Sequence, residues 1–274
     1  MLFRSLFECN QEELLEKYTE NIIEVKRNIA GVGGWQSIFQ ILKTLSYCTD
    51  YVVLRGFEEE NDKVLHGDTD LLVRNWHAAK IILAGQKVRY GKESVLIRTT
   101  INNVEHDFDI RHIGDQYYCE QWEKDILDNH IWSDTYNFFI PNDIDYRYSL
   151  LYHALVQKQF ISSDYKSILE REFKTSNRYN LSNILIEFMN KRHYSFTCPK
   201  DKSVFIFPYY FNKMDIPISR KTFYLVYYYI RKMRKRENGK EEHDRSNEEI
   251  YTILSSKYHL ARKFLRKIKA YIVS

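Results

Sequence analysis

The stretch Leu54–Val73, LRGFEEENDKVLHGDTDLLV, decides how the first half of the chain folds. Its pattern predicts the end of a strand, a corner at Gly56, a polar gap and then a second strand that begins near Asp70. Asp68 and Asp70 stand two residues apart, so on a strand their carboxylates point to the same face. Two carboxylates held that close repel each other unless a cation lies between them, and Mg²⁺ prefers carboxylate oxygens.

A second acid-bearing strand is predicted over Val104–His112, after a strand at 94–100 and a turn at Ile101-Asn102-Asn103. Asp107 and Asp109 have the same parity on this strand, so they share one face. Either of them could supply a third carboxylate to the pair upstream. The two strands together therefore predict a site for a divalent cation.

Composition narrows the class of protein. The chain has 274 residues, 44% of them hydrophobic, which suffices for one large domain or two small ones. Its net charge of +4 is modest, whereas a dedicated nucleic-acid binder usually concentrates more positive charge. No apolar run reaches the length of a membrane span, and the N-terminus lacks a signal-peptide pattern. We expect a cytoplasmic protein without a membrane span, and its scattered cysteines fit reduced thiols: Cys9, Cys48, Cys119 and Cys198.

Hydrophobic spacing predicts the order of the elements. In the first half it favours helices at 10–29, 35–47 and 76–84, and strands at 51–54, 70–73, 94–100 and 104–112. In the second half it favours helices at 143–160, 164–173, 181–192, 221–236 and 248–273, with an extended stretch at 204–211. The change of texture places a domain boundary near residue 140. The expected fold class is α+β.

The first half resembles the nucleotidyltransferase superfamily, whose fold is that of DNA polymerase beta and of small antibiotic-modifying nucleotidyltransferases. The shared pattern is a strand ending in glycine, a gap, Asp-x-Asp and a later strand with a third aspartate. Gly56, Asp68 and Asp70 match it. Asp109 is favoured as the third carboxylate because FDIR followed by DQYYC is similar to the polymerase-beta segment, with Asp107 as a substitute ligand.

The resemblance covers about residues 35–120. It implies a mixed or antiparallel sheet flanked by helices within residues 1–140, and the hydrophobic spacing favours a mainly helical domain at 141–274. It also implies metal-dependent transfer of a nucleotide from a nucleoside triphosphate to a small-molecule, sugar or polyol, or protein acceptor. In that reaction Asp68 and Asp70 would bridge two Mg²⁺ (or Mn²⁺) ions, and Asp109 would hold the ion at the attacking oxygen.

One residue departs from the family pattern, in which serine follows the corner glycine and contacts the triphosphate. This chain has Phe57 there, so nucleotide binding would rely on backbone amides around Gly56 and on Arg55. Arg111 and Lys158 are further candidates for nucleotide contacts. An ordinary ion pair remains open for Arg111, and a position on a packing helix for Lys158.

The acceptor and two other functions stay open. The FDIR strand and the later SLLYHALVQK segment are similar to nucleotidyltransferase-like domains found with surface-polysaccharide genes, which favours a sugar or polyol acceptor. Phe57 supports a non-catalytic binding protein, antitoxin-like or scaffold. The polymerase-like strand and the basic segments Arg231–Arg236 and Arg262–Lys269 support a nucleic-acid polymerase or terminal transferase, whereas the modest net charge counts against nucleic acid.

Overall fold

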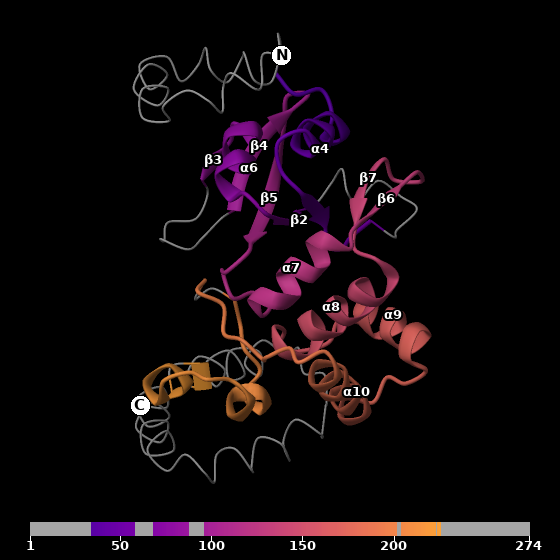
Figure 1. Cartoon of the computed structure of the whole chain (residues 1–274), viewed down its shortest axis with the longest axis vertical. Coiled ribbons are helices and arrows are strands. Elements are labelled where there is room, and N and C mark those ends of the chain that lie inside the picture. Colours follow the sequence, from indigo (N-terminus) through magenta and orange to yellow (C-terminus); the bar gives the residue numbers. More distant parts are fainter. Residues whose placement is uncertain (1–33, 58–67, 88–95, 202–203, 223, 226–274) are drawn as a thin grey trace, which may run out of the picture. The chain divides into compact units, whose positions relative to one another are not determined.

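A computed structural model describes residues 34–57, 68–87, 96–201, 204–222 and 224–225. The chain divides into two compact units (Figure 1). The first comprises Met1–His112 and His130–Ile140, and the second comprises Ile113–Asn129 and Pro141–Ser274. The chain therefore passes between the units after His112, after Asn129 and after Ile140. The last of these passages lies at residue 140, where the sequence predicts a boundary, whereas residues 113–129, expected in the first domain, fall in the second unit.

The first unit is built on a five-stranded mixed sheet in the order β1-β2-β5-β4-β3. Its strands are β1 (Tyr51–Val53), β2 (Thr69–Val73), β3 (Gln86–Lys87), β4 (Leu96–Ile101) and β5 (Val104–His112). β2 and β5 run parallel and every other pair runs antiparallel. The mixed sheet with its helices confirms the expected α+β class.

Two helices of the first unit lie in sequence before and within the sheet: α4 (Ile38–Ser46) and α6 (Trp76–Leu83). α6 contacts β4 and β5, and α4 contacts α6 (Figure 1). The Thr99 hydroxyl of β4 donates to the Leu83 carbonyl of α6, which identifies the sheet face that this helix covers. Phe108 and Ile110 of β5 share that face and are fully buried.

The ends of these helices follow local chemistry. α4 begins three residues later than the predicted start at residue 35, because Trp35 pairs with Ile101 and Ser37 caps the helix by accepting from Gln40 N–H. α6 ends at Leu83 as Ala84 turns left-handed, with φ 48°. Gly85 follows where a Cβ would lie 2.4 Å from the Arg98 carbonyl, so the chain needs glycine at this approach to β4.

A small hairpin completes the first unit, and no element was predicted there. It consists of β6 (Ile131–Ser133) and β7 (Phe138–Ile140), and β7 contacts β1 and α4. Phe138 is buried, and three rings surround it at centroid distances of 5.7 to 6.3 Å: Phe39, Phe57 and Tyr136. The hairpin therefore belongs to the first unit through an aromatic cluster.

The described part of the second unit is helical. It contains α7 (Glu120–Asp128), α8 (Asp143–Val156), α9 (Ser163–Phe173), α10 (Arg178–Lys191) and the 3₁₀ helix η1 (Pro208–Lys213). Asn142, Ser162 and Asn177 cap α8, α9 and α10 by accepting backbone N–H groups. Its core centres on Trp122, which is fully buried among four rings: Tyr118, Tyr152, Phe188 and Tyr194.

Several predicted bounds change in the second unit. The helix predicted at 143–160 ends at Val156, and the side chain of the C-cap residue Gln157 donates to the Tyr117 carbonyl. The stretch predicted as extended at 204–211 becomes the 3₁₀ helix η1 from Pro208 onward. Residues 221–222 and 224–225 are helical. The remainder of the helix predicted at 221–236, and those predicted at 10–29 and 248–273, lie outside the described residues.

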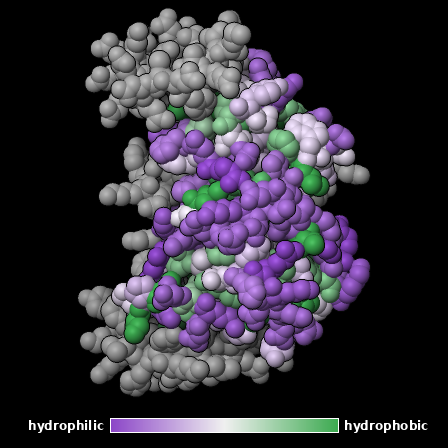
Figure 2. All heavy atoms as spheres, in the orientation of Figure 1, coloured by the Kyte–Doolittle hydropathy of each residue, from purple (hydrophilic) through white to green (hydrophobic). Residues whose placement is uncertain are grey.

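The surface in view in Figure 2 is mainly hydrophilic, with small hydrophobic spots between charged groups. Exposed large apolar side chains come from separate elements, among them Ile81 of α6, Trp132 of β6 and Tyr179 of α10. Within the described residues, the model contains no helix with the length and apolar character needed to cross a membrane.

Candidate functional site

The strand register brings two of the predicted site residues together. β2 and β5 are parallel neighbours, and Asp70 of β2 lies directly opposite Asp109 of β5. Residues paired in this way point to the same side of a sheet, and here it is the side opposite the one that α6 covers. Asp107, two residues before Asp109, points to this side as well. We call the side of the sheet with Asp70, Asp107 and Asp109 the acidic face.

Arginines hold the two opposed carboxylates. Arg55 Nη2 donates to Asp70 Oδ1 at 2.8 Å, and Arg111 Nη2 donates to Asp109 Oδ2 at 2.9 Å. The arginine side chains are only 8% and 3% exposed, whereas each carboxylate side chain keeps 20% of its surface exposed. Burial raises the pKa of Asp70, Arg55 opposes that rise, Asp109 adds to it and Arg111 opposes it again. Guanidinium groups are thus the positive charges that offset this acidic pair.

The other two predicted carboxylates lie differently. Asp107 accepts two hydrogen bonds from Arg98 of β4, at 2.7 and 2.8 Å, and Arg98 also pairs with Glu105 at 3.2 Å. Asp68 is exposed and precedes the first residue of β2, from where it acts electrostatically on Arg98 and His106. Asp107 is therefore turned toward β4 and bound there.

These side chains offer the donors that a divalent cation requires. Carboxylate oxygens suit Mg²⁺ or Mn²⁺, and Asp70 and Asp109 supply two carboxylates from neighbouring strands on one face. Among the described residues, however, no group of three or more His, Cys, Asp or Glu side chains is arranged to hold a metal ion. The donor chemistry fits the cation, and the side chains as they lie are engaged by arginine.

The corner at Gly56-Phe57 has the backbone of a tight turn and an aromatic anchor. Gly56 is exposed with φ +83°, a left-handed conformation that other residues rarely adopt. Phe57 is only 6% exposed, and its ring lies 5.1 Å from that of Tyr136 and 6.2 Å from that of Phe138. The Phe57 side chain therefore packs into the hairpin cluster, which leaves the backbone at Gly56 as the exposed part of the corner.

Sequence reasoning missed a buried pair behind the acidic face. Thr69 is the first residue of β2 and lies between Asp68 and Asp70 in the chain, and its Oγ1 shares a 2.7 Å hydrogen bond with His106 Nε2 of β5. Burial lowers the pKa of His106, which favours the neutral ring, while Asp107 and Asp68 oppose that shift. The pair links the two acid-bearing strands from the opposite side. A polar residue at Thr69, next to the apolar run of the strand, was the signal in the sequence for such a buried hydrogen bond.

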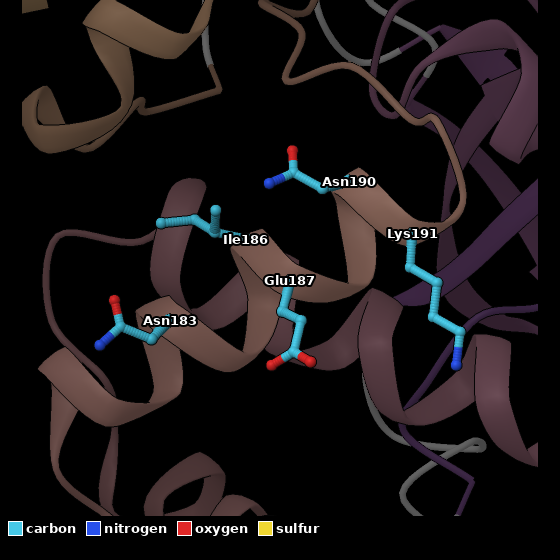
Figure 3. A pocket seen from close by; sticks show the side chains of 5 residues that line it. All are labelled: Asn183, Ile186, Glu187, Asn190 and Lys191. Carbon is cyan, nitrogen blue, oxygen red and sulfur yellow. The ribbon is translucent and has the colours of Figure 1, made fainter.

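Lys158 belongs to the second unit, and so does a cavity lined by described residues of α10. Lys158 is exposed and follows the end of α8. The cavity has a volume of about 600 Å³, and its described lining comes from α10 alone: Asn183, Ile186, Glu187, Asn190 and Lys191 (Figure 3). These side chains gather no catalytic pair, so the acidic face remains the candidate site. The basic segments predicted at 231–236 and 262–269 lie outside the described residues.

Comparison of the chain with models of protein families, with curated proteins and with solved structures found no match. The candidate site therefore rests on its own residues and geometry.

Proposed function

We propose that the protein is a metal-dependent nucleotidyltransferase that transfers a nucleotide from a nucleoside triphosphate to a small-molecule, sugar or polyol, or protein acceptor. The observation that carries this proposal is the placement of Asp70 opposite Asp109 on neighbouring parallel strands. Opposed carboxylates repel each other, so a fold retains them where a cation or a positively charged ligand offsets them. The resemblance of residues 35–120 to the nucleotidyltransferase superfamily supplies the reaction class.

In this proposal some residues of the first unit bind the metal ion and others bind the phosphate groups. Asp70 and Asp109, with Asp68 from the segment before β2, would hold Mg²⁺ or Mn²⁺. The cation would neutralise phosphate oxygens. The exposed backbone at Gly56 lets phosphate approach closely, and the guanidinium of Arg55 beside it suits phosphate oxygens. A cytoplasmic location, where nucleoside triphosphates and Mg²⁺ are abundant, belongs to the same proposal.

Pyrophosphate release tests the proposal directly. The protein is incubated with each nucleoside triphosphate and Mg²⁺ or Mn²⁺, with mixed sugars or polyols as acceptors, and pyrophosphate is measured. We expect release with at least one triphosphate and a loss of about a hundredfold or more in Asp70→Asn and in Asp109→Asn. Asp50→Asn is the matched control, because Asp50 pairs with Arg74 on the exposed surface of the same unit. Equal rates in Asp70→Asn and Asp50→Asn would exclude the acidic face as the active site.

A second candidate function is a non-catalytic binding protein that keeps the nucleotidyltransferase fold. Two observations favour it: arginines bind the three carboxylates of the acidic face, and Phe57 fills the serine position with a buried ring. This function predicts that a nucleoside triphosphate raises the melting temperature while no pyrophosphate is released with any acceptor. An oligonucleotide among the acceptors would reveal a polymerase or terminal transferase instead.

A further inference from the structure

The acidic face contains its own positive charges. Arg55 and Arg111 are both buried, and each donates to one of the two opposed carboxylates at 2.8 and 2.9 Å. The pairs are separate in the chain, since Arg55 comes from the corner after β1 and Arg111 from the end of β5. Both arginines also lower the pKa of Asp70, so both act on the same carboxylate pair. The two guanidinium groups therefore occupy the electrostatic role that a divalent cation would take.

A cation and these arginines oppose each other. A divalent ion bound between Asp70 and Asp109 would sit within a few ångströms of two buried positive charges, where repulsion is strong because little water screens it. The carboxylates are one-fifth exposed, so an ion can approach them from solvent. A guanidinium also binds phosphate through the same donors that it offers to a carboxylate. An anion with several oxygens can therefore draw the arginines away from the aspartates.

We propose that Arg55 and Arg111 are internal counter-ions that keep divalent cations off Asp70 and Asp109 until a phosphate-bearing ligand engages the arginines. This inference rests on the proposed function and specifies the order of binding: the anion binds first and makes the aspartates available to the cation. By linkage, the anion and the cation then bind with positive cooperativity, each raising the affinity for the other by the same factor. A free metal ion alone binds weakly.

Binding of Mn²⁺ alone, followed by electron paramagnetic resonance of the free ion, tests the role of the arginines without any turnover. We expect Arg55→Met to bind Mn²⁺ about tenfold more tightly than the wild type, within the usual range of coupling between sites. Arg55→Lys keeps the charge and should stay near the wild-type affinity. Arg74→Met is the matched control, because it breaks an exposed ion pair with Asp50 in the same unit. Arg55→Met that binds no more tightly than Arg74→Met overturns the proposal.

The wild-type protein provides a second measurement, which decides the matter if Arg55→Met does not fold. Sulfate replaces chloride at constant ionic strength, and we expect it to strengthen Mn²⁺ binding several-fold by engaging the arginines. An unchanged affinity overturns the counter-ion role. If Mn²⁺ binding is then still lost in Asp70→Asn, the proposed function survives that failure. If the wild type, Arg55→Met and the sulfate-treated protein all bind no Mn²⁺, the counter-ion role and the metal-dependent function fail together.

Discussion

Each of the two units holds neighbouring carboxyl groups, and the units offset these groups in different ways. In the first unit, Asp70 and Asp109 face each other and each is bound by a guanidinium group. In the second unit, Glu123 of α7 is fully buried and accepts from two backbone N–H groups, of Gly114 at 2.7 Å and of Tyr118 at 3.1 Å. Burial and the neighbouring Asp115 raise the pKa of Glu123 to about 9.

In the first unit the groups that offset the carboxylates can be exchanged for others, whereas in the second unit they are fixed. A guanidinium on a long side chain can leave a partly exposed carboxylate when a better partner arrives, so the acidic face can change its ligands. The Glu123 carboxyl is fully buried and accepts hydrogen bonds from the backbone, so no ligand from solvent can displace its proton. The first arrangement suits a binding site, and the second suits a structural joint at the start of α7.

Replacing the structural carboxyl should have the largest effect. Glu123→Ala leaves the N–H groups of Gly114 and Tyr118 buried without their acceptor, so we expect the free energy of unfolding to fall by about 2–4 kcal/mol. Urea denaturation followed by tryptophan fluorescence measures this, because Trp122 lies in the same helix. Glu123→Gln retains one acceptor oxygen and should cost less than Glu123→Ala. If both variants are as stable as the wild type, the hydrogen bonds of Glu123 do not contribute to the free energy of unfolding.

The pH dependence of stability should differ between the two arrangements. The folded pKa of Glu123 lies above its unfolded value, so the folded state holds a proton that the unfolded state releases. Its contribution is complete below the ordinary glutamate pKa of about 4.3 and is lost as pH rises toward the raised pKa, by at most about 1.4 kcal/mol per pH unit. Urea midpoints of the wild type should therefore fall between those limits, and those of Glu123→Gln should fall less. Parallel curves would mean that Glu123 is ionised in the folded protein.

The smallest effect is expected at the exposed edge of the acidic face. Arg98 binds Asp107 and Glu105 while its side chain is 40% exposed, and exposed ion pairs contribute little to stability. Arg98→Met should leave the melting temperature unchanged, whereas Arg55→Met should lower it and regain stability when Mn²⁺ is added. Differential scanning calorimetry with and without Mn²⁺ compares the two. Equal behaviour would erase the distinction between buried and exposed arginines on this face.

Hydrophobic spacing and strand alternation predicted much of the sheet unit. The strand Val104–His112 has the predicted bounds, and the shared face of Asp107 and Asp109 followed from parity alone. Parity could not show that Asp70 and Asp109 lie in register, because strand order depends on contacts between distant segments. It also could not assign a partner to Arg55, since a long side chain selects among neighbours that only the folded chain brings together.

The helix α7 and the β6–β7 hairpin were not predicted, although the sequence contains signals for both. α7 has Trp122, Ile126 and Leu127 on one buried stripe, but its start at Cys119 has no capping side chain to mark it. The β6–β7 hairpin turns at Asn137, whose φ of 57° is typical of asparagine in a tight turn. Its strands are only three residues each, too short for alternation to be read with assurance. Both elements lie where the chain passes between units.

Because the chain crosses between the units three times, the units cannot be exchanged separately by recombination of the gene. Because residues 113–129 belong to the second unit and 130–140 to the first, neither unit corresponds to one uninterrupted length of gene. A recombination event at residue 140 would transfer α7 without the Phe188 and Tyr194 rings against which Trp122 packs. Such a fragment would expose Trp122 to solvent, whereas this side chain is fully buried in the whole chain. The two units are therefore expected to have been inherited and to have diversified together, and not as interchangeable cassettes.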